Sequence, residues 1–119
     1  MASLAPENDE LVLRLSRREK LGALHGDVRV PLSAVERVSV SATPFRELRG
    51  LRAPGAGLPG VIALGTWRYR AGKDLVALYR RTPGVIVDLR DAPYRRLLVS
   101  ADDAPAIAAA IRRRAPNAI

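Results

Sequence analysis

Hydrophobic and polar residues alternate along much of the chain with the two-residue period of β-strands that bury one face. Leu11, Leu13 and Leu15 share one side of segment 10–16, which predicts a first strand. The same pattern predicts strands in 27–32 and 36–42, where valines alternate with polar residues. A half-buried antiparallel strand has this pattern.

Segment 16–26 allows two interpretations. Ser16 and Glu19 have the spacing of a capping box, which favours one or two turns of helix. The alternative is a strand that continues into a turn at 25–27. We favour the short helix.

Four more apolar segments follow at intervals of about ten residues, separated by turn signals, and they bring the predicted strands to seven. Residues 71–74 predict a hairpin turn after the first of these segments. The regular spacing indicates an all-β meander. The segments are 60–70, 75–81, 84–90 and 94–101.

The alternation is lost in 44–60, which is rich in Pro, Gly and Arg and predicts a long connection with one helical turn in 44–50. Residues 1–9 and 116–119 show no period and are expected to be tails, with a single domain at 10–115. Segment 102–116 predicts a helix. Asp102 and Asp103 suit its N-terminus, and arginines 112–114 suit its C-terminus.

The composition limits which kinds of functional site the chain can have. A chain of 119 residues without cysteine and with one histidine predicts one domain, no disulfide, no thiolate nucleophile, no metal centre and no cofactor. The N-terminus lacks the features of a signal peptide, and no apolar run has the roughly 18 residues of a membrane span. We therefore expect a cytoplasmic protein.

"GAGLPG" at 55–60 has the spacing G-x-G-x-x-G of a dinucleotide-binding loop. That loop requires a buried strand before it and a helix after it, because the helix N-terminus holds the phosphate. Segment 46–54 is charged and broken, and 61–70 has the composition of a strand. Asp74, at the distance of the usual acidic residue, falls in the predicted turn. The glycines therefore predict a flexible connection.

The net charge is +8, and residues 44–81 carry eight basic and two acidic side chains, a net +6. Arginine forks in this region could hold phosphate or carboxylate oxygens bidentately. The alternatives are solvated outer faces of strands, or an arginine excess that reflects a high-GC genome. The candidate anion- or partner-binding residues are Arg46, Arg49, Arg52, Arg68, Arg70 and Lys73.

Seven antiparallel strands followed by a C-terminal helix resemble the pleckstrin-homology (PH) superfold, and the bacterial PH-like domains in particular. "DVRVPLSAVERVSV" (27–40) is similar to their strand, Pro-containing turn and short strand. Segment 65–111, beginning "GTWRYRAGKD", is similar to their glycine-led hairpin, two strands and Asp-started helix. The resemblance implies a mainly β fold: a strongly bent antiparallel sheet, or partly open barrel, of about seven strands capped by one helix.

Two departures limit what this resemblance implies about function. The single tryptophan, Trp67, lies on a predicted strand instead of the terminal helix. The basic signature of phosphoinositide-binding members is missing after Lys20, so phosphoinositide recognition is not implied.

We therefore expect a non-enzymatic interaction module that binds a protein partner or an anionic membrane surface through the basic face, or assembles with copies of itself. Nucleic-acid binding through the same face is the alternative, although five aromatic residues leave little for base stacking. Catalysis is not expected. His25 stands in a turn, and the sequence has no G-x-S-x-G elbow.

Overall fold

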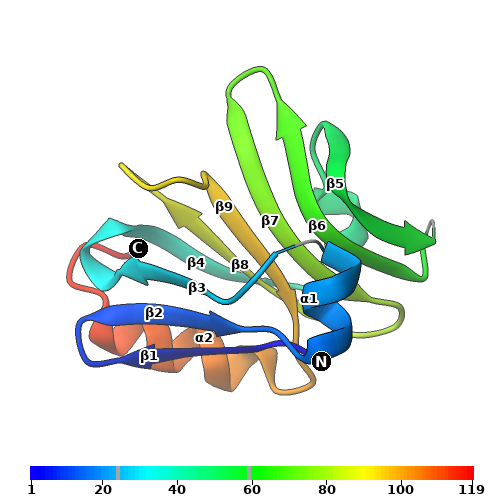
Figure 1. Cartoon of the computed structure of the whole chain (residues 1–119). Helices are drawn as coiled ribbons and strands as arrows, with labels where there is room; N and C mark the ends of the chain where they lie inside the picture. Colours follow the sequence, from blue (N-terminus) through cyan, green and yellow to red (C-terminus); the bar gives the residue numbers. More distant parts are fainter. Residues whose placement is uncertain (24, 59) are drawn as a thin grey trace.

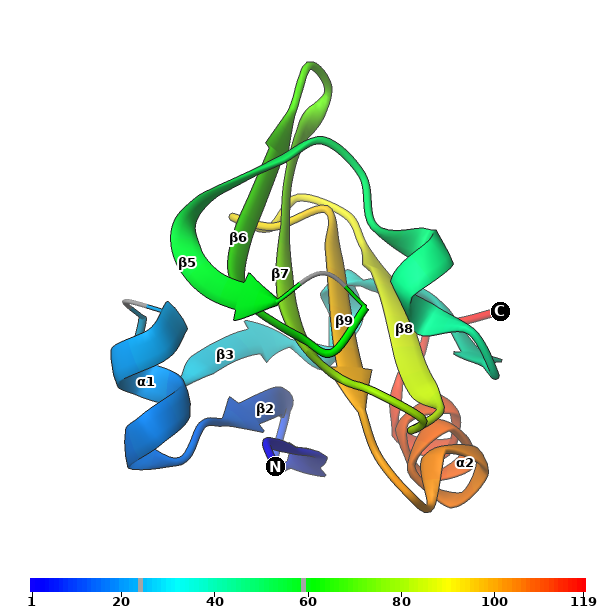
Figure 2. The ribbon, with the colours of Figure 1, turned by 90° about the vertical axis from the view of Figure 1, so that its right-hand side faces the viewer.

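The computed structural model describes residues 1–23, 25–58 and 60–119, with the side chains of 53–56 excepted. Within these residues the chain forms two sheets and two α-helices (Figures 1 and 2). The small sheet has the order β1-β2-β3, formed by Ser3–Glu7, Glu10–Arg14 and Val28–Pro31. The mainly β architecture with a C-terminal helix is confirmed.

The large sheet has six strands in the order β4-β8-β9-β7-β6-β5. It does not join the small sheet into a closed barrel in the described part of the chain. The partly open barrel that the resemblance implies is thus not confirmed. The strands are β4 (Val35–Ser41), β5 (Leu51–Leu58), β6 (Ile62–Tyr69), β7 (Gly72–Tyr79), β8 (Gly84–Leu89) and β9 (Arg96–Ser100).

The predicted meander is wrong at β9. This strand lies between β7 and β8 and pairs with β7 in parallel (Figure 1). Leu97, Leu98 and Val99 are all buried, so β9 packs apolar side chains on both faces. A strand that is apolar on both faces suits the centre of a covered sheet, and this stabilises the inserted position.

Two segments without clear alternation also form strands. Residues 3–7, expected to be part of a tail, form β1. Leu4 on this strand and Ala2 just before it are buried in the core. The expected irregular connection is wrong for 51–58, which forms β5, while its helical turn is confirmed as the 3-10 helix η2 (Pro44–Glu47). The glycine stretch therefore runs along an edge strand, and β6 follows it in place of a helix. Pro59 lies outside the described residues.

The short helix is confirmed as α1 (Arg17–Ala23), and its capping box forms. The Ser16 N–H donates to Glu19 Oε1 at 2.8 Å, and the Glu19 N–H donates to Ser16 Oγ at 3.2 Å. Glu19 is only 2% exposed, and its second oxygen accepts from the Tyr79 hydroxyl of β7 at 2.6 Å. Burial, followed by this bond, raises the pKa of Tyr79 above its ordinary value. The cap thus also ties α1 to the large sheet.

The C-terminal helix α2 (Ala104–Arg114) buries Ala104, Ala108 and Ile111 in the main core, where it contacts β1, β4 and β8. Its Arg112 guanidinium donates to the Val38 carbonyl of β4, with Nη2 at 2.6 Å. The segment expected to be a C-terminal tail also follows β4: the Ile119 N–H donates to the Glu36 carbonyl at 3.1 Å. These contacts satisfy part of the exposed edge of β4.

We predict that Tyr79→Phe lowers the free energy of unfolding by about 1–2 kcal/mol, because it leaves a buried oxygen of Glu19 without its donor. The variant should also lose free energy of unfolding less steeply than the wild type as the pH rises above 10. The pKa of Tyr79 is raised from the ordinary 10.0, so the neutral phenol contributes fully below pH 10. That contribution falls as the pH rises above 10, where the unfolded-state phenol ionises and the folded-state phenol does not, and it is gone above the folded-state pKa. Urea unfolding between pH 8 and pH 11 measures both effects; wild-type stability and slope in the variant would contradict them.

Candidate functional site

Two rows of charged side chains cross the large sheet near the start of β7, and they differ in sign pattern. The first, the alternating row, contains Asp74, Arg96, Asp88 and Arg37, which are neighbours in register on β7, β9, β8 and β4. The second, the basic row, contains Arg68 on β6, Lys73 on β7 and Arg95 just before β9. Lys73 and Asp74 are consecutive in β7, so their side chains lie on opposite faces.

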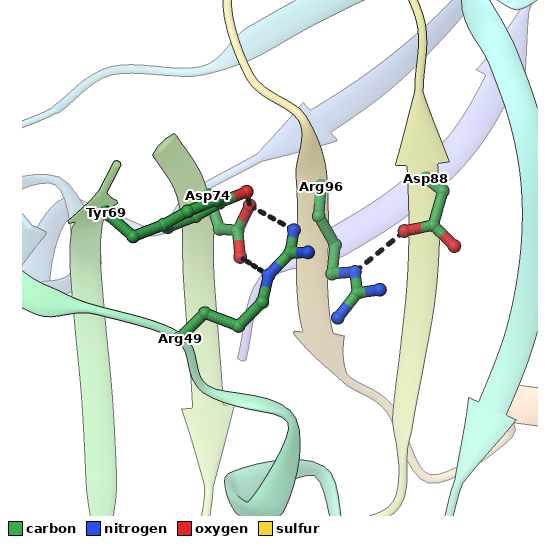
Figure 3. A network of polar contacts seen from close by, with 5 residues as sticks. All are labelled: Arg49, Tyr69, Asp74, Asp88 and Arg96. Carbon is green, nitrogen blue, oxygen red and sulfur yellow. Dashed lines mark hydrogen bonds and ion pairs between the residues drawn. The ribbon is translucent and has the colours of Figure 1, made fainter. Parts of the chain in front are cut away.

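Asp74 anchors the alternating row. It is fully buried, and it accepts hydrogen bonds from Arg49 Nε and Nη2, each at 2.9 Å, and from the Tyr69 hydroxyl at 2.7 Å (Figure 3). The Arg49 guanidinium also lies 4.5 Å from the centre of the Tyr69 ring. A buried carboxylate is tolerated only when it is paired and hydrogen-bonded, as it is here. The prediction of Asp74 in a hairpin turn is wrong, because it lies inside β7.

The protonation of this network follows from its contacts. The hydrogen bonds to Asp74 raise the pKa of Arg49 further above its ordinary value. Burial, followed by the bond to Asp74, raises the pKa of Tyr69. Arg49 therefore stays charged and Tyr69 stays a phenol, as their roles as donors require.

Gly50 allows the chain to bring Arg49 to Asp74, which lies 25 residues later in the sequence, on β7. Its φ of +78° is in the left-handed region, and a Cβ there would stand 2.1 Å from the Arg68 carbonyl oxygen. Only glycine permits both the turn and this close approach to β6. The chain after η2 can therefore lie flat against the sheet and place Arg49 over Asp74.

Arg96 and Asp88 in the alternating row are also paired with each other. Arg96 Nε donates to Asp88 Oδ1 at 2.7 Å, and the two side chains are 19% and 26% exposed (Figure 3). Arg37 lies beside Asp88 in register and is exposed. A hollow of about 250 Å³ on this face has both signs of charge in its lining, including Glu36 and Asp88. Four arginines, Arg37, Arg49, Arg95 and Arg96, also line it, and two of them are bound to Asp74 and Asp88.

The basic row contains side chains of one sign only. Arg68, Lys73 and Arg95 line a hollow of about 540 Å³, and none of its described lining residues is acidic. Arg68 and Lys73 are directly opposite across β6 and β7, and the Arg95 N–H donates to the Lys73 carbonyl at 2.8 Å. Like charges directly opposite on a sheet are destabilising. A bound anion would reverse that cost, so this hollow, the basic hollow, is the candidate site.

Tyr94 lies under the basic row and contacts Lys73. The Lys73 ammonium lies 5.1 Å from the centre of its ring, which fixes the charge by a cation–π contact. The Tyr94 hydroxyl bonds to Nε2 of His25, whose Nδ1 lies 2.8 Å from the Gly26 carbonyl. If Nδ1 carries the proton and donates to that carbonyl, Nε2 accepts from the tyrosine. Burial raises the pKa of Tyr94, which keeps it a phenol.

The six residues singled out from the sequence do not form one cluster. Arg68 and Lys73 lie together in the basic hollow, with Arg70 exposed in the adjacent turn. The other three lie elsewhere: Arg49 is bound to Asp74, Arg52 lies on β5 in register with Trp67, and Arg46 lies in η2.

Sequence reasoning missed Arg95. The run of Tyr94, Arg95 and Arg96 before an apolar strand was the available signal. It gave no indication of the parallel pairing that brings Arg95 to Lys73. Among the described residues, no group of three or more side chains that could ligate a metal ion occurs.

We predict that Asp74→Asn lowers the free energy of unfolding by about 3 kcal/mol, because it leaves the Arg49 charge without its buried partner. The matched variant Asp88→Asn should cost about 1 kcal/mol or less, because that ion pair is partly exposed. Chemical denaturation of both variants measures the difference. Equal losses would show that burial does not distinguish the two pairs.

A scan against protein-family models, a search of the curated proteins and a search of the solved structures each found no match to this chain.

Proposed function

We propose that the protein is a non-enzymatic interaction module that binds an anionic partner surface through the basic hollow. The supporting observation is the basic row itself: Arg68, Lys73 and Arg95 lie on neighbouring strands around one hollow with no acidic residue in its described lining. Phosphate or carboxylate groups match this row, because guanidinium forks take them bidentately and an ammonium takes them as a point charge.

The row is preorganised for such a ligand. Lys73 is held over Tyr94, and the Arg95 side chain packs on Gly72, where a Cβ would stand 2.5 Å from Arg95 Cδ. Held side chains lose less conformational entropy when an anion binds. Binding would therefore use a fixed surface, with the anion relieving the repulsion between neighbouring cations.

An anionic lipid surface or an acidic protein fits this row better than a nucleic acid. Recognition of single strands relies on open aromatic faces. Near the row, Tyr94 lies buried under Lys73, Trp67 is buried, and Tyr69 is covered by Arg49. No helix in the described part of the chain is long and apolar enough to span a membrane. The resemblance to bacterial PH-like domains stays a prediction, and the proposal does not depend on it.

Lys73→Gln/Arg95→Gln should weaken binding to phosphatidylglycerol vesicles about tenfold or more, because two charge-assisted contacts are lost. Arg17→Gln/Arg18→Gln is the matched control. It removes the same charge from the exposed face of α1 and should change binding less than twofold. Co-sedimentation at modest salt measures both, with circular dichroism to confirm folding.

Equal weakening in the two double variants would show that net charge, and not the basic hollow, attracts the vesicles. Absence of binding by the wild type would exclude the lipid version of the proposal. A gel shift with single-stranded DNA tests the alternative in parallel. A steep salt dependence that needs Lys73 and Arg95, without vesicle binding, would favour nucleic acid over a lipid surface.

A further inference from the structure

A second hollow, of about 220 Å³, lies at the opposite end of the large sheet, between the start of η2 and the turn that joins β7 to β8. Its described lining contains three apolar residues, two threonines and two arginines, with no acidic residue. We call it the Phe45 hollow. It shares no lining residue with the basic hollow, so the two can be tested independently.

The apolar side of the Phe45 hollow is fixed by packing. Phe45 packs against the second core cluster, which includes Leu78 and Ile86. Pro44 lies directly over Gly84, where a Cβ would stand 2.7 Å from the Pro44 Cβ. Close contact on both residues holds this wall in place, and an apolar surface of this kind favours a hydrocarbon group over water.

The charged side consists of Arg46 from η2 and Arg81 from the turn after β7, two residues far apart in sequence. Both are exposed, and neither makes a side-chain hydrogen bond or ion pair with the residues that the structure describes. Arg81 has a φ of 58°, in the left-handed region that non-glycine residues rarely adopt. Such backbone conformations cluster at binding sites, where the surrounding structure holds them.

We propose that the Phe45 hollow binds the anion of a small carboxylic acid with an apolar body. A cavity of roughly 150 Å³ accommodates benzene, so this volume admits a six-membered ring and a carboxylate. The carboxylate is held by the unpartnered donors of Arg46 and Arg81, and the ring packs on Pro44 and Phe45. Inorganic phosphate would leave the apolar wall unused, and a neutral hydrocarbon would leave both arginines without a partner.

Benzoate is the probe for this site. Titration of the ¹⁵N-labelled chain at fixed ionic strength should give saturable NMR shifts for the amides of Thr43, Phe45, Arg46, Arg81 and Thr82. Acetate keeps the charge without the ring, and benzyl alcohol keeps the ring without the charge. Each should bind about tenfold more weakly, because each retains only one of the two interactions.

Arg46→Gln and Arg81→Gly should each weaken benzoate about tenfold. Glycine accepts the left-handed backbone at 81, so the second variant removes the guanidinium with little disturbance of the turn. Arg113→Gln, on the exposed side of α2, is the matched control and should leave affinity unchanged, as should Lys73→Gln/Arg95→Gln. Shifts that do not saturate, acetate binding equal to benzoate, or benzoate binding that persists in both hollow variants would each overturn the proposal.

Discussion

The parallel pairing of β7 with β9 is the constraint on which both charged rows depend. It sets Asp74 beside Arg96 and brings Arg95 to Lys73, which no antiparallel meander would do. The pairing is stabilised because β9 buries Leu97, Leu98 and Val99 on both faces, and only a central position in the sheet covers both. Hydrophobic burial thus places β9 in the centre of the sheet, and its pairing there places the charged side chains.

Charged side chains are arranged differently on the two faces of the large sheet. On one face, signs alternate from strand to strand, and Arg49 adds a bidentate contact to the buried Asp74, with Gly50 permitting its approach. On the other face, three cations of the same sign are neighbours, and the described lining supplies no acid. The distribution of charge therefore differs between the two faces.

The edges of the large sheet also differ. Arg112 and Ile119 satisfy backbone groups of β4, so this edge is partly covered. The edge strand β5 carries a proline and a register irregularity between Arg52 and Gly55, and both features oppose pairing with another strand. Leu51 on β5 is nevertheless 79% exposed. Self-assembly of the chain stays a prediction, and β7 and β8 lie inside the sheet, away from its edges.

The sequence by itself determined the elements whose signal is local. Alternation located most of the strands, Ser16 and Glu19 indicated the cap of α1, and the Asp-to-Arg polarity of 102–114 indicated α2. It also located much of the basic charge. Tertiary structure decided the order of strands, the burial of Asp74 and the separation of Arg49 from Arg68. The physical reason is that a period reports which face of a segment is buried, whereas its hydrogen-bond partners lie on segments distant in sequence. Arg95 joins Lys73 only through such a long-range pairing, so the basic row could not be read from the chain itself.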